Sequence, residues 1–429
     1  MAARAGSGVD VHLDRVPQRE LDLGPVEIMI SESQERMVCT VALARLERVR
    51  AVCRKWELDC TVIGEVTRGG ELRAFFHGEQ VGAIPAELLT KRAPRYTLET
   101  RSRELAEPIE HRPTRADPED LIALLASPNI RSRRPVFERY DHLVGSRTVR
   151  RPGLDAAVVR MRTSMRGLAL SLDGAGRLAY LDPRAGGAHA VLEAARNVAC
   201  VGGQPLAITD CLNFGNPEKA EIAWELQEVI EGMAAACEAL RIPVVSGNVS
   251  LYNETDGRAI YPTPVVGCVG LVADVRRVPG QWRSGDAIFL VGGDTESLDG
   301  SEYQARFLGG PAGRPPAPNL ALESALVRFL WRSAPLFTSV HDTSEGGLAV
   351  ALAELALAAK IGARVEIDND IVAWFGEGAG RALVTCPPDD ESILEGMPYR
   401  RIGVVGGTRL LGAALADLAP AYESGQVST

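Results

Sequence analysis

The sequence has 429 residues, 46% of them hydrophobic and 24% charged, and a formal net charge of −9. This is the composition of an ordinary globular protein of about two to four domains, and its mildly acidic balance disfavours nucleic acid or an anionic membrane as a partner. No apolar run of about 18 residues is present, so no transmembrane helix is expected. The first residues lack the apolar core of a signal peptide, and we expect a cytoplasmic protein.

The eight cysteines are scattered along the chain without a Cys-x-x-Cys pair. Most lie within apolar runs, which favours reduced, buried thiols over disulfides. A structural zinc site is not expected without paired spacing.

The N-terminal stretch predicts a polar turn, a strand, a helix and a hairpin. Ser31-Glu32-Ser33-Gln34 is the turn, and Val38–Val41 is an apolar run typical of a buried strand. A helix is expected up to about Trp56, followed by a hairpin of Thr61–Thr67 and Glu71–Phe76. Taken alone, the polar turn fits a helix cap better than a ligand contact.

Residues 93–153 are rich in arginine and proline and contain few long apolar runs. One short helix is expected at Pro118–Leu125. A basic segment can bind nucleic acid, but the few aromatic residues here are not interleaved with the charges, as stacking on bases requires. We interpret the segment as a connector that packs over the protein surface, with its arginines paired to acidic neighbours.

Residues 154–275 predict a sheet with two long helices. The apolar spacing places strands at Ala156–Arg160, Gly167–Leu172 and Val265–Val272, and helices at Ala188–Val201 and Pro217–Leu240. The first helix carries Glu193, Arg196 and Asn197, which we interpret as caps of neighbouring turns rather than as site residues.

Two further apolar runs of this region, Leu206–Thr209 and Ile242–Val245, predict neighbouring buried strands. The first run ends at Asp210, and the second ends in Ser246-Gly247-Asn248-Val249-Ser250. Polar residues at the ends of neighbouring strands are where α/β proteins bind ligands.

The residue types at these strand ends suit a nucleotide and a cation. The Asp210 carboxylate can accept hydrogen bonds from a ribose or a nucleotide amine, and Gly247 lets a backbone N–H approach a phosphate. Asn248 offers a neutral oxygen to Mg2+, and Ser250 offers a hydroxyl to a phosphate. Ser, Gly and Asn are also ordinary turn formers, which is the alternative reading of this segment.

Residues 276–429 predict a further α+β domain. A strand at Ala287–Gly292 and a helix at Leu320–Arg332 precede SVHDTSEGGLAVALAELALAA, a polar head followed by a Gly-Gly turn and a strongly apolar helix. Asp342 and Glu345 in this head suit either a ligand or the positive end of the helix, and the residues alone do not decide between the two roles.

The two ends of the chain share an internal repeat. FGEGAGRALVTC followed by YRRIGVVGGTRL echoes SESQERMVCTV followed by LDCTVIGEVTRGGEL. Both predict a turn, an arginine, a buried strand, a connecting segment and then Ile-Gly with a hairpin, so we expect two copies of one domain type. Because Gly-Glu-Gly-Ala-Gly (376–380) replaces the polar turn, the C-terminal copy is expected to serve structure more than catalysis.

Long strings of the sequence resemble the PurL-type phosphoribosylformylglycinamidine synthases of purine biosynthesis. They are SESQERM, DPRAGGAHAVLEAARNVACVGGQPLAITDCLNFGNPEKAE, SGNVSLYNETDGRAIYPTPVVGCVGLV and SVHDTSEGGLAVALAE. They occur in order over nearly the whole chain. In the last string, Thr343 replaces an apolar residue of the family's HDVSEGG motif.

The resemblance implies an α+β (mixed α/β) fold of PurM-like N-terminal-type and C-terminal-type domains, in a duplicated architecture whose first N-terminal-type domain is missing. The expected domains are the remainder of the first C-terminal-type domain (1–92), the connector (93–153), the second N-terminal-type, ATP-binding domain (154–275) and the second C-terminal-type domain (276–429). The chain is thus expected to be the C-terminal portion of the enzyme. The missing part would carry the catalytic histidines and most metal-binding acids, so no catalytic residue is expected in this chain.

The same resemblance implies the ligands, ATP and Mg2+, and the substrate formylglycinamide ribonucleotide (FGAR). ATP is assigned to Asp210 and Gly247, Mg2+ to Asn248, and the substrate to Glu32, Ser33, Gln34 and Ser250. The implied partners are a glutaminase subunit and a small accessory subunit. In the implied reaction the substrate's amide oxygen attacks the γ-phosphate of ATP, and ammonia then displaces phosphate.

Two alternatives stay open. One is another ATP-dependent phosphotransferase of the same superfamily, against which the absence of an Asp-rich N-terminal glycine loop argues. The other is a non-catalytic remnant or binding partner, against which the intact Asp210, Asn248 and SESQ turn argue weakly.

Overall fold

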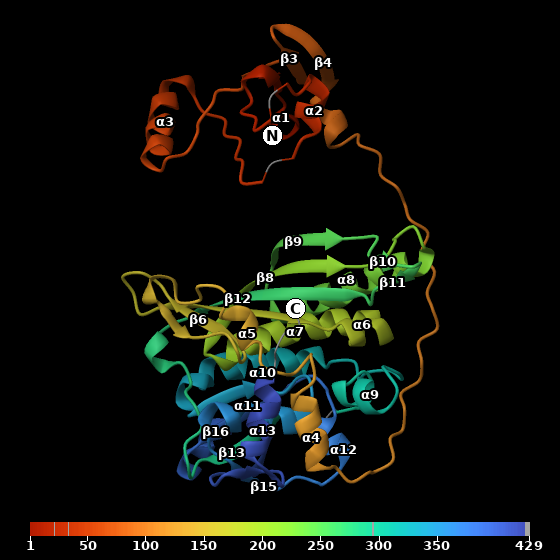
Figure 1. The fold of residues 1–429 in the computed structure, drawn as a ribbon, viewed down its shortest axis with the longest axis vertical. Coiled ribbons are helices and arrows are strands. Elements are labelled where there is room, and N and C mark those ends of the chain that lie inside the picture. The colour runs from red at the N-terminus through yellow and green to blue at the C-terminus, as the bar shows by residue number, and fades with distance from the viewer. Residues whose placement is uncertain (21, 33, 294–295, 425–429) are drawn as a thin grey trace. The chain divides into compact units, whose positions relative to one another are not determined.

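The computed structural model describes residues 1–20, 22–32, 34–293 and 296–424 (Figure 1). The chain forms two compact units, unit 1 at Met1–Thr97 and unit 2 at Leu98–Thr429. No helix among the described residues is long and apolar enough to cross a membrane.

Unit 1 is built on a four-stranded sheet of order β2-β1-β3-β4. Its strands are β1 (Gly8–His12), β2 (Gly64–Thr67), β3 (Glu71–Phe76) and β4 (Glu79–Pro85), and its helices are α1 (Ala2–Ala5), α2 (Pro25–Ile30) and α3 (Leu46–Lys55). The helix predicted before Trp56 is therefore confirmed. The core of this unit is small and centres on Leu13, Ile28 and Ala74.

The predicted hairpin of unit 1 is wrong in its pairing. Both strands form, but β1 lies between them, antiparallel to β2 and parallel to β3. β3 instead pairs with β4. The short glycine turn between β2 and β3 predicts that these two strands pair directly. In the structure β1, which comes from far upstream, lies between them.

The strand predicted at Val38–Val41 is also wrong. Residues 36–42 belong to no strand or helix, and Met37 and Val38 are 89% and 68% exposed. An apolar run becomes a buried strand only when neighbouring strands pair with it and a second layer covers it. Its counterpart in the repeat, β16 (Arg381–Cys386), pairs with one strand on each side. Ala382, Val384 and Cys386 of β16 also lie in a buried core that includes residues 326, 327 and 330 of a helix.

Unit 2 contains a six-stranded sheet of order β5-β6-β7-β12-β8-β9. Its strands are β5 (Thr148–Arg150), β6 (Ala157–Arg160), β7 (Gly167–Gly174), β8 (Gly203–Asn213), β9 (Val244–Ser250) and β12 (Thr263–Val272). Only β8 and β9 run parallel, and helix α8 (Ala220–Leu240) connects them. The strands predicted at Ala156–Arg160, Gly167–Leu172 and Val265–Val272 and the two long helices are confirmed.

A second sheet of unit 2 has the order β14-β16-β13-β17-β15 and is antiparallel throughout. Its other strands are β13 (Ala287–Gly292), β14 (Ser339–Asp342), β15 (Ala363–Val365) and β17 (Tyr399–Val405). Its principal helices are α10 (Leu320–Ser333), α11 (Gly347–Ala359), α12 (Ile371–Phe375) and α13 (Leu415–Glu423). The predicted strand at Ala287–Gly292 and the helix from Leu320 are confirmed.

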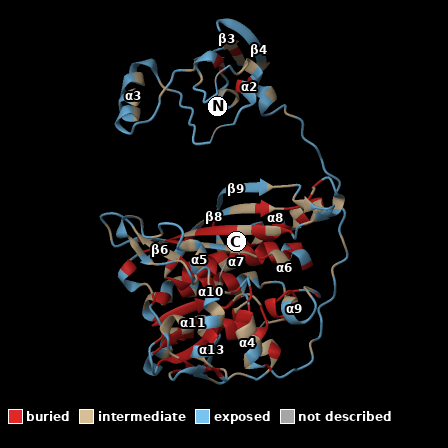
Figure 2. Cartoon of the chain, in the orientation of Figure 1, coloured by how far each residue is buried: buried red, intermediate tan, exposed pale blue. Residues whose placement is uncertain are grey.

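Helix α7 (Pro183–Cys200) lies between the two sheets of unit 2 (Figure 2). One side of it, with Val191 and Val198, packs in the core of the six-stranded sheet. Ala195 and Ala199 face the core of the second sheet and α10. Its glycines allow α8 to approach closely, because a Cβ on Gly187 would lie only 2.3 Å from the carbonyl oxygen of Val229.

The connector contains the predicted helix and the predicted ion pairs of its arginines. Helix α4 spans Pro118–Leu125, and arginines upstream of it pair with acids of α8. Arg101 lies 3.1 Å from Glu221, and Arg103 lies 3.2 Å from Glu225.

The eight cysteines are free, as predicted. Their predicted burial holds for only four of them, Cys200, Cys237, Cys268 and Cys386.

A buried histidine joins several elements of unit 2. His341 of β14 contacts the Asp155 carboxylate through Nδ1 at 2.9 Å and the Glu354 carboxylate through Nε2 at 3.1 Å. Tyr422 of α13 donates to the other oxygen of Glu354 at 3.3 Å. Burial alone lowers the pKa of His341, but the two carboxylates outweigh it and raise the pKa to about 10. The ring is therefore a buried cation at neutral pH.

The stability of unit 2 is expected to fall as the pH rises above 7. Because the pKa of His341 is raised from about 6.5 in the unfolded chain, its contribution is complete below that value and is lost as the pH passes through about 10. Urea unfolding between pH 6 and 10 should show a slope of up to ~1.4 kcal/mol per pH unit that is flattened in His341→Gln. His77→Gln, in unit 1, is the control, and an unchanged slope in His341→Gln would contradict the charge assignment.

Candidate functional site

The predicted ATP and metal residues lie on two neighbouring strands, but inside them rather than beyond their ends. β8 continues through Asp210 to Asn213, and β9 continues through Gly247 to Ser250. The prediction that the strands stop at Asp210 and Ser246 is therefore wrong. β9 is also not a buried strand: it is the edge of the sheet and is exposed from Val244 to Val249 (Figure 2). Polar residues fit here because an edge strand needs no apolar cover.

Strand register brings the predicted residues together in pairs. Asp210 lies opposite Gly247, and Asn213 lies opposite Ser250. Side chains alternate between the two faces of a strand, so Asp210 and Gly247 share one face, while Asn248 and Ser250 share the other. A ligand that contacts all four must therefore reach round the free edge of β9. We call Asp210, Gly247, Asn248 and Ser250 the edge site.

The absence of a side chain at Gly247 makes room for the Asp210 carboxylate. A Cβ at this position would lie 2.6 Å from Asp210 Oδ1 and 2.8 Å from Oδ2. The carboxylate lies on the α8 side of the sheet, where its charge adds to burial in raising the pKa of Cys237 to about 11. Burial raises the pKa of Asp210 itself. The result is a partly desolvated acceptor beside an open stretch of backbone.

On the other face, neighbouring residues orient Asn248 and Ser250. The Asn248 amide nitrogen lies 3.9 Å from the Cys211 sulfur, which leaves the amide oxygen for another partner. Asn253 donates to the carbonyl oxygens of Phe214 and Ser250 at 3.0 and 2.9 Å, and its own oxygen lies 3.3 Å from Ser250 Oγ. The Ser250 hydroxyl is thus held in place. Asn253 is a residue that the sequence analysis missed.

The predicted substrate residues Glu32 and Gln34 lie in unit 1 and are exposed. Ser33 lies outside the described residues. The edge site lies wholly in unit 2.

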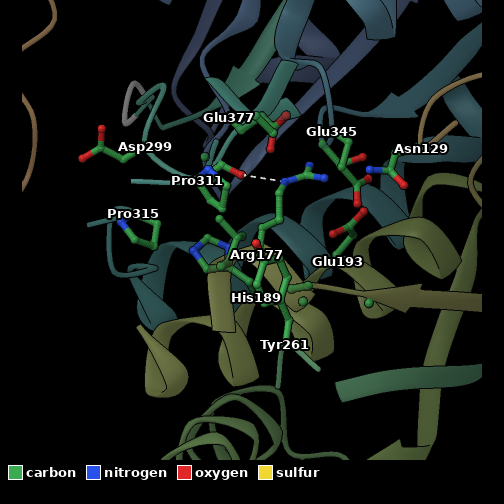
Figure 3. A pocket seen from close by; sticks show the side chains of 18 of the residues that line it. Asn129, Arg177, His189, Glu193, Tyr261, Asp299, Pro311, Pro315, Glu345 and Glu377 are labelled. Atoms are coloured by element: carbon green, nitrogen blue, oxygen red, sulfur yellow. Dashed lines mark hydrogen bonds between the residues drawn. The ribbon is translucent and has the colours of Figure 1, made fainter. Parts of the chain in front are cut away.

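Unit 2 also contains a polar cavity of about 520 Å3 (Figure 3). It is lined by side chains from several elements, among them Asn129, Arg177, His189, Glu193, Glu345 and Glu377. Glu193 of α7 and Glu345 from the turn before α11 point toward each other (Figure 3). The sequence analysis interpreted Glu193 as a cap, left the role of Glu345 open and assigned no site role to the other four.

Burial raises the pKa of acidic groups in and next to this cavity. Burial, followed by the charge of Glu345, raises the pKa of Glu193 well above its ordinary value and that of Asp173 to about 8. Burial raises the pKa of Glu377 to about 7. Burial also lowers the pKa of His189 to about 4, so its ring is neutral. At pH 7 the Asp173 carboxyl group, with a pKa of about 8, mostly keeps its proton and can donate a hydrogen bond as well as accept one.

Arg177 is already paired within the cavity wall. It lies 2.7 Å from a Glu302 oxygen and donates to the Gly300 carbonyl at 3.1 Å. Among the described residues, no group of three or more His, Cys, Asp or Glu side chains is arranged to hold a metal ion.

The interpretation of Glu193, Arg196 and Asn197 as caps is wrong. Arg196 is 2% exposed and binds both Asp342 oxygens, at 2.7 and 3.2 Å, and both Glu323 oxygens, at 3.0 and 3.1 Å. Asn197 donates to Asp173 at 2.8 Å. The role of Asp342, left open by the sequence, is therefore to neutralise a buried arginine. Only the packing of α7 between two sheets makes these polar residues face inward.

Models of known protein families match this chain in three segments. The model for the N-terminal domain of AIR synthase-related proteins matches residues 153–272, and the model for their C-terminal domain matches residues 1–77 and again 283–414. Together the two models match most of the chain. The chain belongs to the AIR synthase-related family. Its mixed α/β fold thus has the order C-terminal, N-terminal, C-terminal domain, and the predicted duplication is confirmed.

Similar proteins within this family include PurL subunits. The phosphoribosylformylglycinamidine synthase subunit PurL of Moorella thermoacetica is 46% identical over 96% of this chain, and that of Thermomicrobium roseum is 46% identical over 97%. The chain spans 59% and 60% of the length of these relatives.

Solved structures of PurL are also similar to this chain. T. maritima PurL complexed with ATP has a TM-score of 0.66 and 27% identity, covering 95% of this chain and 60% of that one. T. maritima PurL complexed with FGAR has a TM-score of 0.69 and 28% identity, covering 95% and 59%. The resemblance to the PurL-type family is thereby confirmed.

Removal of the Arg196 charge should strongly destabilise this AIR synthase-related chain. Arg196→Gln leaves the Asp342 and Glu323 carboxylates buried without their cation, which is expected to lower the free energy of unfolding of unit 2 by about 3–5 kcal/mol. Urea denaturation measures the loss. The matched control on the same helix is Arg184→Gln, whose pair with Glu228 is more exposed and worth about 0–1 kcal/mol. Equal losses in the two variants would show that the buried cluster is not a principal stabilising element.

Proposed function

We propose that this chain forms part of an ATP-dependent phosphoribosylformylglycinamidine synthase, a ligase of purine biosynthesis. The reaction converts FGAR into the corresponding amidine with glutamine-derived ammonia, through a phosphorylated amide. The observation that carries the proposal is the 46% identity to PurL subunits over nearly the whole chain. Because the chain spans about three fifths of those relatives, we propose that it supplies part of the site, in line with the absence of a predicted catalytic residue.

The edge site is the proposed position of ATP. The Asp210 carboxylate suits the exocyclic amine of adenine as an acceptor. The backbone of the exposed edge strand β9 has unpaired N–H and C=O groups, and Gly247 leaves them open to a ligand. A solved PurL structure complexed with ATP, at 27% identity, supports ATP as the ligand.

Asn248 is the proposed Mg2+ residue. Its amide oxygen is free to coordinate, since its nitrogen faces Cys211. Mg2+ usually binds through one or two protein oxygens together with phosphates and water, so a single neutral ligand fits a metal that arrives with the nucleotide. When bound, Mg2+ neutralises the charge that develops on the transferred phosphate.

Ser250, Glu32, Ser33 and Gln34 are the proposed contacts to FGAR. Ser250 lies on the same face of β9 as Asn248, so the phosphate end of ATP and the substrate would meet on that face. Asn253 keeps the Ser250 hydroxyl oriented. These residues bind and orient the reactants, and none is proposed as an acid–base catalyst. PurL complexed with FGAR supports the choice of substrate.

A glutaminase subunit and a small accessory subunit are the proposed partners. The PurLQS structure from Thermotoga maritima, with a TM-score of 0.69 and 28% identity, supports an assembly of PurL with further subunits. The domain boundaries at 92, 153 and 275 and the cytoplasmic location stay predictions.

The first test is ammonia-dependent release of ADP from ATP in the presence of FGAR and Mg2+. Purified chain should be assayed alone and together with the segment of a PurL relative that it does not span. We expect activity only in the combined sample, since that segment is expected to carry the catalytic histidines. Activity of the chain alone would place the catalytic groups here. Inactivity of both samples would favour a remnant or a binding role.

Asn248→Ala should remove the part of ATP affinity that depends on Mg2+. Calorimetric titration with ATP, once with Mg2+ and once with a chelator, separates the two contributions. We expect the gain on adding Mg2+ to shrink at least about tenfold, equivalent to ~1.4 kcal/mol, and the affinity without Mg2+ to stay the same. Val245→Ala, at an exposed position of the same strand, is the control. An undiminished gain in Asn248→Ala would rule out the metal role.

A further inference from the structure

The duplication allows unit 1 to be compared with the C-terminal part of unit 2. β1 pairs antiparallel with β2 so that Val11 lies opposite Gly64, and β15 pairs antiparallel with β17 so that Val365 lies opposite Gly403. A Cβ at either glycine would collide with the same kind of neighbour, lying 1.9 Å from the carbonyl oxygen of Asp10 or 2.3 Å from that of Arg364. Strands β1 and β2 are therefore the counterparts of β15 and β17.

A short helix follows the first strand in each copy. α2 ends at Ile30 before Ser31-Glu32, and α12 ends at Phe375 before Gly376-Glu377. The corresponding side chains differ sharply in burial. In unit 1, Val26, Met29 and Ile30 are 69%, 49% and 74% exposed, whereas in unit 2, Ile371, Trp374 and Phe375 are 6%, 5% and 0% exposed.

Helix α11 accounts for the burial in unit 2. It immediately precedes β15 and packs on α12. The contact is so close that a Cβ on Gly347, its first residue, would lie 2.8 Å from the carbonyl carbon of Phe375. Its alanine- and leucine-rich residues share one core cluster with Trp374 and Phe375. In unit 1 the helix before β1 is the four-residue α1.

Unit 1 has an apolar groove at the corresponding place. Its volume is about 310 Å3, and its lining includes Leu13, Val26, Met29, Ile30, Leu72 and Ile84. All of its lining residues are apolar or glycine. An exposed groove of this composition is typical of an interaction surface, and the second copy of the domain shows what fills the equivalent space.

We propose that the groove of unit 1 binds one alanine- and leucine-rich helix of the α11 type, supplied by the part of a PurL-type polypeptide that this chain does not span. The relatives extend well beyond the matched region, which covers 59–61% of their length. A second copy of this chain is a poor donor, because residues such as Leu352 and Ala353 of its own α11 are fully buried. The docked helix would cover α2 and the faces of β3 and β4, as α11 covers α12.

The probe is a fluorescent peptide with the sequence of residues 346–360, flanked by lysines for solubility and titrated with the full chain. We expect saturable binding in fluorescence anisotropy. We also expect slower hydrogen exchange in α2, β3 and β4 on binding. The double substitution Val26→Asp and Ile30→Asp should weaken binding at least tenfold, because both charges enter the apolar groove.

Two variants make the result specific. Leu58→Asp carries a charge at another exposed position of unit 1 and should bind the peptide like the original chain. Ile30→Val keeps the groove apolar and should also bind. Hydrogen exchange in β1 and β2 checks that the doubly charged variant remains folded.

The proposal is overturned if binding is absent or if the doubly charged variant binds equally well. It is also overturned if the chain self-associates through this groove, so that the double substitution abolishes a concentration-dependent dimer that the peptide does not dissociate. A second copy would then be the occupant.

Discussion

The structure of unit 2 depends on one buried cation. Arg196 stands in the middle of α7, the helix that both sheets pack against, and its guanidinium is neutralised by Asp342 from β14 and Glu323 from α10. A guanidinium that is almost completely removed from water is tolerated only when its charge and its N–H groups are satisfied together. The cluster thereby fixes the position of α7 relative to the second sheet, while the alanines and glycines of α7 fix its distance from α8 and from the six-stranded sheet. His341, one residue before Asp342, adds a second buried cation held between Asp155 and Glu354.

The six-stranded sheet that packs on α7 ends in the exposed strand β9. β8 is held between β12 and β9, whereas β9 has only one neighbour and presents its outer side to solvent. The predicted ATP and Mg2+ residues thus lie where the backbone is still able to hydrogen-bond a ligand. The close approach of Asp210 to Gly247 explains why a glycine is needed within a strand, where glycine is otherwise unfavourable. Asn253, by joining Ser250 to the carbonyl oxygen of Phe214, holds the end of β9 against the loop that leaves β8.

Elements with strong local signals were predictable from the sequence, including α4, α8 and β13, because apolar spacing alone defines them. The errors arose where the outcome depends on distant parts of the chain. Val38–Val41 is as apolar as its counterpart in β16 but lacks neighbours in unit 1, and the pairing of β1 between β2 and β3 involves a strand more than 50 residues upstream. Arg196 and Asn197 look like capping residues on an amphipathic helix, and only a layer on each side of α7 turns them inward. The edge-site residues were recognised from their residue types at the predicted strand ends, and the family resemblance then assigned their ligands. Their alternation across β9 could not be predicted without the observed strand boundaries.

The two copies of the C-terminal-type domain place the same residue types in different surroundings. Glu377 is the counterpart of Glu32, and Arg381 is the counterpart of Arg36. In the C-terminal copy, Glu377 is buried and accepts hydrogen bonds from the backbone N–H groups of Glu302 and Gly346, both at 2.7 Å, while Arg381 is fully buried and paired with Glu296. In unit 1, Glu32 and Arg36 are exposed. A carboxyl group whose oxygen is already shared by two backbone amides has little capacity left for a ligand. The glutamate that is proposed to contact substrate in unit 1 therefore has a counterpart that serves as an internal support in unit 2.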